Sequence, residues 1–252
     1  TDEKEPNAHE EKSTTGTPIR PGLGVKLPPE GELNKWSRAT LLMSLCRSSF
    51  RGLMGLGFRY YTGFKCHGLE NLPANGPFII AANHSSHADT AAILVAVGKR
   101  ASTLNALAAR DYWFRNRLWG WVFHTFLGTV PFDRQGHGAD SLGLAVGLLQ
   151  RKHSLLFFPE GGRSNSGEMR SFKSGIGLLA LESGIPVVPT HIHGTFKVLP
   201  KGRSIIKRHP VQVRFGPPVL ADSYLHVSNN EGLYDLSRQI AADVQRAVEA
   251  LA

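Results

Sequence analysis

A histidine and an aspartate five positions apart are the residues of this chain best suited to chemistry. Residues 83–89 read Asn-His-Ser-Ser-His-Ala-Asp, with His84 first and Asp89 last of the pair. Five helical steps of about 100° leave two side chains roughly 140° apart, so the pair cannot meet on one face of a continuous helix. If the chain turns after His84, Asp89 can accept a hydrogen bond from one imidazole nitrogen. The other nitrogen is then free to take a proton from a substrate hydroxyl.

The neighbouring sequence predicts such a turn. Residues 77–82, Pro-Phe-Ile-Ile-Ala-Ala, are typical of a buried strand, and the apolar run 91–97 after Asp89 suits a packed helix. We therefore expect His84 on a strand-to-helix turn. Without the other motifs, these two residues have a simpler interpretation, in which Asp89 caps a helix and His84 is a turn histidine whose hydrogen bonds are satisfied. The motifs that follow, in their order along the chain, favour the catalytic one.

Two further strand ends present arginines that suit a phosphate. Residues 128–134, Gly-Thr-Val-Pro-Phe-Asp-Arg, end a strand candidate with Arg134. Residues 158–164, Phe-Pro-Glu-Gly-Gly-Arg-Ser, place Arg163 after two glycines, which allow close approach to backbone N–H groups. Arginine in such a place can bind a phosphate through two parallel hydrogen bonds. Each arginine by itself is more often an ordinary surface charge.

Strand-like and helical stretches alternate over the body of the chain. The strand candidates are residues 78–82, 103–108, 129–132, 154–158, 187–192 and 211–215. The helix candidates are residues 139–149, 172–182 and 233–251. This alternation predicts an α/β fold, a single-domain sandwich with a mostly parallel central sheet flanked by helices, whose ligands lie at the strand ends.

Length and composition favour one folded domain with an N-terminal tail. A chain of 252 residues with 41% apolar content can bury one substantial core. Residues 1–32 lack apolar periodicity and are expected to be a disordered tail or linker, and residues 65–252 to form the folded domain. Because the sequence begins at Thr1, we expect a processed product or a fragment of a longer protein.

The net charge of +9 is unevenly distributed. Seven acidic and four basic side chains through Glu32 give the tail −3, which leaves +12 for the remainder. A basic body indicates an anionic partner, which is nucleic acid, an anionic membrane or a phosphorylated substrate. Cys46 and Cys66 have no metal-binding or redox spacing, so we expect a reducing compartment.

Two segments have the composition of a membrane interface. No run of about 20 apolar residues occurs, which argues against a membrane-spanning helix. Residues 33–64 mix leucines and aromatics with arginines, as in basic amphipathic helices, and we expect a break around Gly52, Gly55 and Gly57. Residues 112–121 hold three of the four tryptophans beside two arginines. Either segment can instead pack on the core. We expect peripheral or monotopic membrane association on the cytoplasmic side.

The motifs together resemble the four-block signature of the glycerolipid acyltransferase superfamily, which includes the lysophosphatidic acid acyltransferases. The blocks are Asn-His-x4-Asp, Gly-x3-Phe-Asp-Arg, Phe-Pro-Glu-Gly-x-Arg-Ser and, at residues 185–189, Ile-Pro-Val-Val-Pro. The resemblance covers roughly residues 65–220. It implies transfer of a fatty acyl group from acyl-CoA or acyl carrier protein to a lyso-glycerophospholipid hydroxyl. The expected acceptor is 1-acylglycerol-3-phosphate, which gives phosphatidic acid, and no cofactor or metal is implied.

The resemblance also implies roles for individual residues. His84 would be the general base and Asp89 the residue that orients it. The residues implied to bind the acceptor or shape its pocket are Gly128, Arg134, Glu160, Gly161, Gly162, Arg163, Ser164 and Lys173. Gly162 stands where members acting on lysophosphatidate often carry threonine. The sequence therefore leaves open another lysolipid or glycerol-3-phosphate as acceptor.

Three alternatives accompany this reading. Ser85 and Ser86 follow the base directly, which suggests a mechanism with a covalent acyl-serine intermediate. A side chain adjacent to the base in sequence usually points away from it, so we expect direct transfer. A metal-dependent hydrolase would use imidazoles and carboxylates of His84, His87, Asp89, His191 and His193. A non-enzymatic membrane-binding or nucleic-acid-binding module fits the charge, but no nucleic-acid fold signature occurs, so no nucleic-acid partner is expected.

Overall fold

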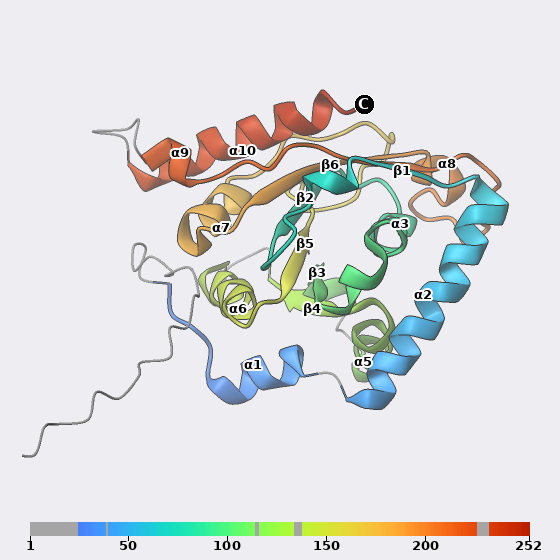
Figure 1. Cartoon of the computed structure of the whole chain (residues 1–252), viewed down its shortest axis with the longest axis horizontal. Helices are drawn as coiled ribbons and strands as arrows, with labels where there is room; N and C mark the ends of the chain where they lie inside the picture. The colour runs from blue at the N-terminus through green and yellow to red at the C-terminus, as the bar shows by residue number, and fades with distance from the viewer. Residues whose placement is uncertain (1–24, 39, 114–115, 134–137, 226–231) are drawn as a thin grey trace, which may run out of the picture.

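A seven-stranded sheet runs through the computed structural model, which describes residues 25–38, 40–113, 116–133, 138–225 and 232–252 (Figure 1). The strands are β1 Lys65–His67, β2 Ile79–Ala82, β3 Leu104–Ala109, β4 Thr129–Phe132, β5 Ser154–Phe157, β6 Val187–His193 and β7 Gln212–Phe215. Their order is β1-β7-β6-β2-β5-β3-β4, and only the β6–β7 pair is antiparallel. The predicted α/β fold with a mostly parallel sheet is confirmed.

Helices cover both faces of this sheet. They are α1 Glu30–Ser37, α2 Leu41–Thr62, α3 Ala88–Val97, α4 Arg110–Trp113, α5 Arg117–Leu127, α6 Gly138–Gln150, α7 Gly175–Ser183, α8 Thr195–Val198, α9 Asp222–Leu225 and α10 Leu233–Glu249, with short 3-10 turns η1 Leu69–Asn71 and η2 Gly98–Ser102. In β2, Ile79 belongs to the core cluster under α6, α7 and α10, and Ile80 to the cluster on the α3 side. A strand covered on both faces explains the continuous apolar run in the sequence.

The predicted strands are present with shifts of one or two residues at their ends. The sequence reasoning missed β1, because this edge strand has three residues and exposes both Lys65 and His67. A short polar strand of this kind has no apolar alternation to reveal it.

The break expected around Gly52, Gly55 and Gly57 is wrong. Helix α2 is continuous through all three and ends at Gly63, whose φ of 56° is the left-handed conformation that terminates many helices. Each glycine costs a helix about 1 kcal/mol relative to alanine. Packing of α2 against α3 and α5 offsets this cost, and Gly55 lies in that contact, where an added Cβ would be 3.9 Å from Val95.

The tail that the sequence places at residues 1–32 includes a packed part. Residues 25–37 lie along α6, and Leu33 is buried in the core. Residue 32 falls inside α1, so the folded part begins earlier than the expected boundary. One buried leucine in a polar stretch gives no periodic pattern, which is why the sequence did not reveal this contact.

Candidate active site

His84 and Asp89 meet at the turn between β2 and α3. His84 Nδ1 lies 2.9 Å from Asp89 Oδ2, and the same oxygen accepts the N–H groups of Ser85 at 2.7 Å and Ser86 at 2.8 Å. The Asp89 side chain is fully buried, while that of His84 is 19% exposed. Because a carboxylate only accepts hydrogen bonds, Nδ1 donates to Asp89, and Nε2 is the ring nitrogen left to exchange a proton with a substrate.

The backbone and ring of His84 are both held in place. Its N–H donates to Glu160 Oε1 at 2.7 Å, and its carbonyl accepts the N–H of Ser164 at 2.8 Å. The imidazole stacks on Phe158 with ring centroids 3.9 Å apart and planes 16° apart. The preceding Asn83 exchanges two side-chain hydrogen bonds of 3.0 and 2.7 Å with the main chain of β6. These contacts fix the direction of Nε2.

Glu160 braces two loops from a buried position. It is 1% exposed, and its second oxygen accepts the N–H of Arg170 at 3.1 Å. Burial raises the pKa of Glu160 to about 7, against the opposing effect of its two backbone hydrogen bonds. The sequence assigned this carboxylate to the acceptor's phosphate. Its oxygens instead hold the main chain of His84 and Arg170, and a buried carboxylate would repel a phosphate.

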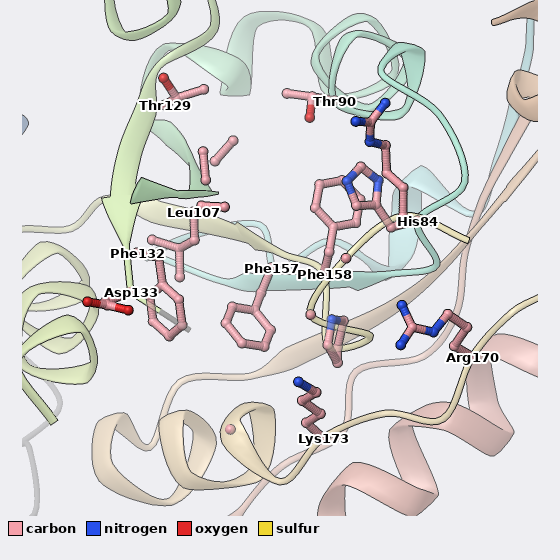
Figure 2. A pocket seen from close by; sticks show the side chains of 18 of the residues that line it. His84, Thr90, Leu107, Thr129, Phe132, Asp133, Phe157, Phe158, Arg170 and Lys173 are labelled. Carbon is pink, nitrogen blue, oxygen red and sulfur yellow. The ribbon is translucent and has the colours of Figure 1, made fainter. Parts of the chain in front are cut away.

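His84 lines a cavity of about 900 Å³, in which it lies beside Phe158 (Figure 2). One part of the cavity is basic and contains Arg163, Arg170, Lys173 and Lys201. The other part is mostly apolar, although Asp133 lies there beside Phe132 (Figure 2). Its larger apolar side chains are Leu107, Leu127, Phe132, Leu142, Phe157 and Leu178. The volume suits a small-molecule site, and the two linings suit an amphiphile with an anionic group.

The predicted site residues separate into those that line this cavity and those behind it. Gly161, Gly162, Arg163 and Lys173 line it together with His84. Gly161 has a φ of 70°, and an added Cβ would lie 3.0 Å from Lys173 Nζ, so only glycine fits comfortably there.

Two further predicted residues, Ser164 and Gly128, lie outside the lining of the cavity. Ser164 holds the main chain of His84 and accepts the N–H of Gly167 at its hydroxyl, 3.1 Å away. Gly128 ends α5 with a φ of 64° and passes close to Leu104 O, where an added Cβ would be 3.0 Å away. Arg134 lies outside the described residues.

The profile of the Acyltransferase family matches residues 63–193, which include the His84–Asp89 pair and the loop of Arg163. The chain belongs to the acyltransferase family. The resemblance drawn from the four sequence blocks is thereby confirmed.

Individual acyltransferases are similar to this chain over different lengths. It is 34% identical over 145 residues to the chloroplast 1-acyl-sn-glycerol-3-phosphate acyltransferase of Arabidopsis thaliana, covering 56% of this chain and 39% of that protein. It is 28% identical over 171 residues to the Bacillus subtilis 1-acyl-sn-glycerol-3-phosphate acyltransferase, covering 68% and 81%. The crystal structure of the Thermotoga maritima 1-acyl-sn-glycerophosphate acyltransferase has a TM-score of 0.64 and 25% identity, covering 88% and 87%. The chain spans about two fifths of the length of the plant relatives.

Three basic residues of the acyltransferase cavity were not predicted as substrate-binding, namely His87, Arg170 and Lys201. His87 was considered only as a metal ligand; burial, then the charges of Arg163 and His84, lower its pKa to about 4, so its imidazole is neutral at pH 7. Arg170 and Lys201 come from loops, where a basic side chain usually faces solvent. Only the folded arrangement brings these two side chains to the cavity. The sequence did identify Arg163, which lines the same cavity, from the two glycines that precede it.

The acyltransferase does not assemble the metal site that the sequence raised as an alternative. No three of His84, His87, Asp89, His191 and His193 come together as a group able to share a metal ion. His191 and His193 lie on β6 with ring centroids 6.4 Å apart, and burial lowers the pKa of His191 to about 4. His191 is half-buried and His193 is exposed, and neither lines the cavity of His84.

Proposed function

We propose that this chain transfers a fatty acyl group from an acyl thioester to the free hydroxyl of 1-acylglycerol-3-phosphate, giving phosphatidic acid. The observation that carries the proposal is the position of His84, which is oriented by Asp89 and lines one cavity that has both basic and apolar side chains. Family membership supports acyl transfer, and relatives named 1-acyl-sn-glycerol-3-phosphate acyltransferase support the acceptor.

His84 would act as the general base. Its Nε2 takes the hydroxyl proton as the acceptor oxygen attacks the thioester carbonyl, and the resulting tetrahedral intermediate expels the thiolate. The imidazolium then returns the proton to sulfur, while Asp89 stabilises the positive ring through Nδ1. General-base help of this kind accelerates a reaction about 10²–10⁴-fold.

The basic lining would hold the acceptor's phosphate. Arg163, Arg170 and Lys173 share the cavity with His84, and guanidinium groups bind phosphate through paired hydrogen bonds. A phosphate bound there would fix the hydroxyl near Nε2 and so reduce the entropic part of the barrier. The apolar lining would receive the acyl chain of the donor, which is acyl-CoA or acyl carrier protein.

The serines beside the base support direct transfer. The Ser86 hydroxyl donates to Leu199 O at 2.7 Å, and the Ser85 hydroxyl lies 3.5 Å from that of Thr195. Both serines are buried and neither lines the cavity. A covalent acyl-serine would require these hydroxyls to leave their present partners and turn toward the substrate.

An exposed apolar face on α2 and α5 supports peripheral membrane association. The two helices pack together at one side of the molecule (Figure 1), with Phe50 and Phe126 in contact at 5.2 Å. Their exposed large apolar side chains are Leu41, Leu42, Leu45, Leu53, Leu56, Tyr60 and Tyr61 on α2 and Leu118, Trp119 and Trp121 on α5. We call these ten exposed residues of α2 and α5 the apolar face. In the part of the chain that the structure describes, no helix is long and apolar enough to cross a bilayer.

The decisive experiment is an acyl-transfer assay in mixed micelles with long-chain acyl-CoA and lysophosphatidic acid. His84→Ala should lower kcat at least 10²-fold, because it removes the base. His67→Ala is the matched control, since His67 is exposed on β1 and outside the cavity, and it should retain full activity. Arg163→Ala should raise KM for the acceptor, whereas Arg203→Ala, an exposed arginine outside the cavity, should not.

Two results would contradict the proposal. Full activity of His84→Ala would rule out base catalysis by this residue. Absence of transfer by the wild type, when acyl carrier protein donors and an acceptor panel with glycerol-3-phosphate and other lysolipids are included, would leave only the membrane-binding alternative.

A further inference from the structure

We propose that the segment before α1 limits the length of the acyl chain that is transferred, with Val25 as the end wall of the apolar part of the cavity. This inference rests on the proposed acyl transfer. Val25 lines the cavity although it lies 59 positions before His84 in the sequence and outside the family match, which begins at residue 63. We call residues 25–29 the strap.

Val25 and the base reach the cavity from different elements of the fold. His84 follows β2, whereas Val25 packs against Gly143 of α6, the helix that follows β4 at the edge of the sheet. From β2 across β5 and β3 to β4 are three strand spacings of about 4.8 Å, or roughly 14 Å. Cavity residues come from each of these strands or the loop after it, including Phe157, Ala108 and Phe132. The apolar path therefore leads from His84 across the strand ends toward Val25.

The strap is seated by the shape of α6. An added Cβ at Gly143 would lie 2.2 Å from the backbone oxygen of Lys26, so this position admits the strap only as glycine. At Gly147 an added Cβ would lie 2.6 Å from Leu33 Cδ2, so Leu33 of α1 packs closely on the same helix. One turn further along, Arg151 Nη1 donates to two side chains of α1 at 3.0 and 2.9 Å. In Figure 1 the segment before α1 passes alongside α6. The strap therefore has a defined seat, which makes Val25 a fixed wall.

A fixed wall gives a sharp limit to chain length. Each methylene that enters the apolar lining improves binding about fourfold. This gain ends where the chain meets Val25, because a longer chain has to displace the strap from α6. Replacing Val25 by a larger side chain should therefore shorten the preferred donor, and replacing it by a smaller one should lengthen it.

The test measures kcat/KM for saturated acyl-CoA donors of 10 to 18 carbons with one constant lysophosphatidic acid, so that only the transferred chain varies. Val25→Trp should move the optimum to shorter donors and lower kcat/KM for the longest ones about tenfold or more, equivalent to two lost methylenes. Val25→Ala should move the optimum to longer donors. Leu27→Trp is the control, because Leu27 is exposed on the same strap and outside the cavity, and its profile should match the wild type.

Opposite shifts in the two Val25 variants cannot arise from simple loss of folding. If Val25→Trp lowers the thermal midpoint, Val25→Ala still carries the test, because a smaller side chain leaves the strap seated. Coincident profiles for wild type and both Val25 variants would overturn the inference while leaving the proposed function intact. Wild-type protein that transfers no donor at all would overturn the proposed function and the inference with it.

Discussion

Two buried carboxylates define the geometry of His84, and they do so in different ways. Asp89 gathers the ring Nδ1 and two backbone N–H groups on one oxygen, so the base and the turn that carries it share one anchor. Glu160 joins the main chain of His84 to that of Arg170, which lines the cavity. The imidazole of His84 and a cation of the basic lining are therefore positioned by a side chain that lies outside the cavity. At this scale the proposed catalytic geometry depends on residues outside the cavity.

Glu160 predicts a specific dependence of stability on pH. Because burial raises its pKa from the ordinary 4.5 to about 7, the folded state retains its proton where the unfolded state has lost it. Protonated Glu160 therefore contributes about 3 kcal/mol to the free energy of unfolding. This contribution is complete below about pH 4.5 and is lost as the pH rises through 7. Glu160→Gln does not titrate, so urea unfolding between pH 5 and 8 should lose this slope. Glu168→Gln, an exposed control in the same loop, should keep it; an unchanged slope in Glu160→Gln would contradict the assignment.

A buried arginine ties α2 to the end of α5. Arg47 of α2 is 7% exposed, and it donates from Nε to Thr125 O at 2.9 Å and from Nη2 to His124 O at 2.7 Å. These carbonyls lie in the last turn of α5, and His124 O also accepts the N–H of Gly128 at 3.0 Å. Burial lowers the pKa of Arg47, as expected for a cation held by neutral carbonyls. Arg47 thus links the two helices that carry the apolar face.

Arg47→Met should show how much the hydrogen bonds of Arg47 contribute to stability. The variant removes the charged donor from two buried carbonyls, and hydrogen bonds to a charged group are each worth about 1.5–3 kcal/mol. We expect the free energy of unfolding, measured with urea, to fall by at least that amount. Arg59→Met replaces an exposed arginine of the same helix and should change stability by less than about 0.5 kcal/mol. Equal effects of the two substitutions would show that the Arg47 contacts contribute nothing.

Over the whole molecule, the sequence predicted best where structure follows from local pattern. Six strands and the turn of His84 were predictable, because apolar runs bounded by turn residues indicate buried strands. The continuity of α2 was not, since its glycines are tolerated through packing on distant helices. Neither were the placement of Arg170 and Lys201 in the cavity and of Val25 at its wall. Each of these depends on contacts between segments far apart in the chain, which no local pattern records.

The apolar face predicts how the whole molecule meets a bilayer. Leu53 is 70% and Trp119 56% exposed, so replacing both with glutamine should leave the fold intact while removing apolar area from the interface. Losing about 1 kcal/mol of burial per side chain should weaken binding to anionic phosphatidylglycerol vesicles roughly tenfold or more in a flotation assay. Leu220→Gln, an exposed leucine before α9 and outside the apolar face, is the control. Added salt should weaken wild-type binding only in part, because it screens the basic residues and leaves the apolar contact. Vesicle binding of the double variant equal to that of the wild type would show that another surface meets the membrane.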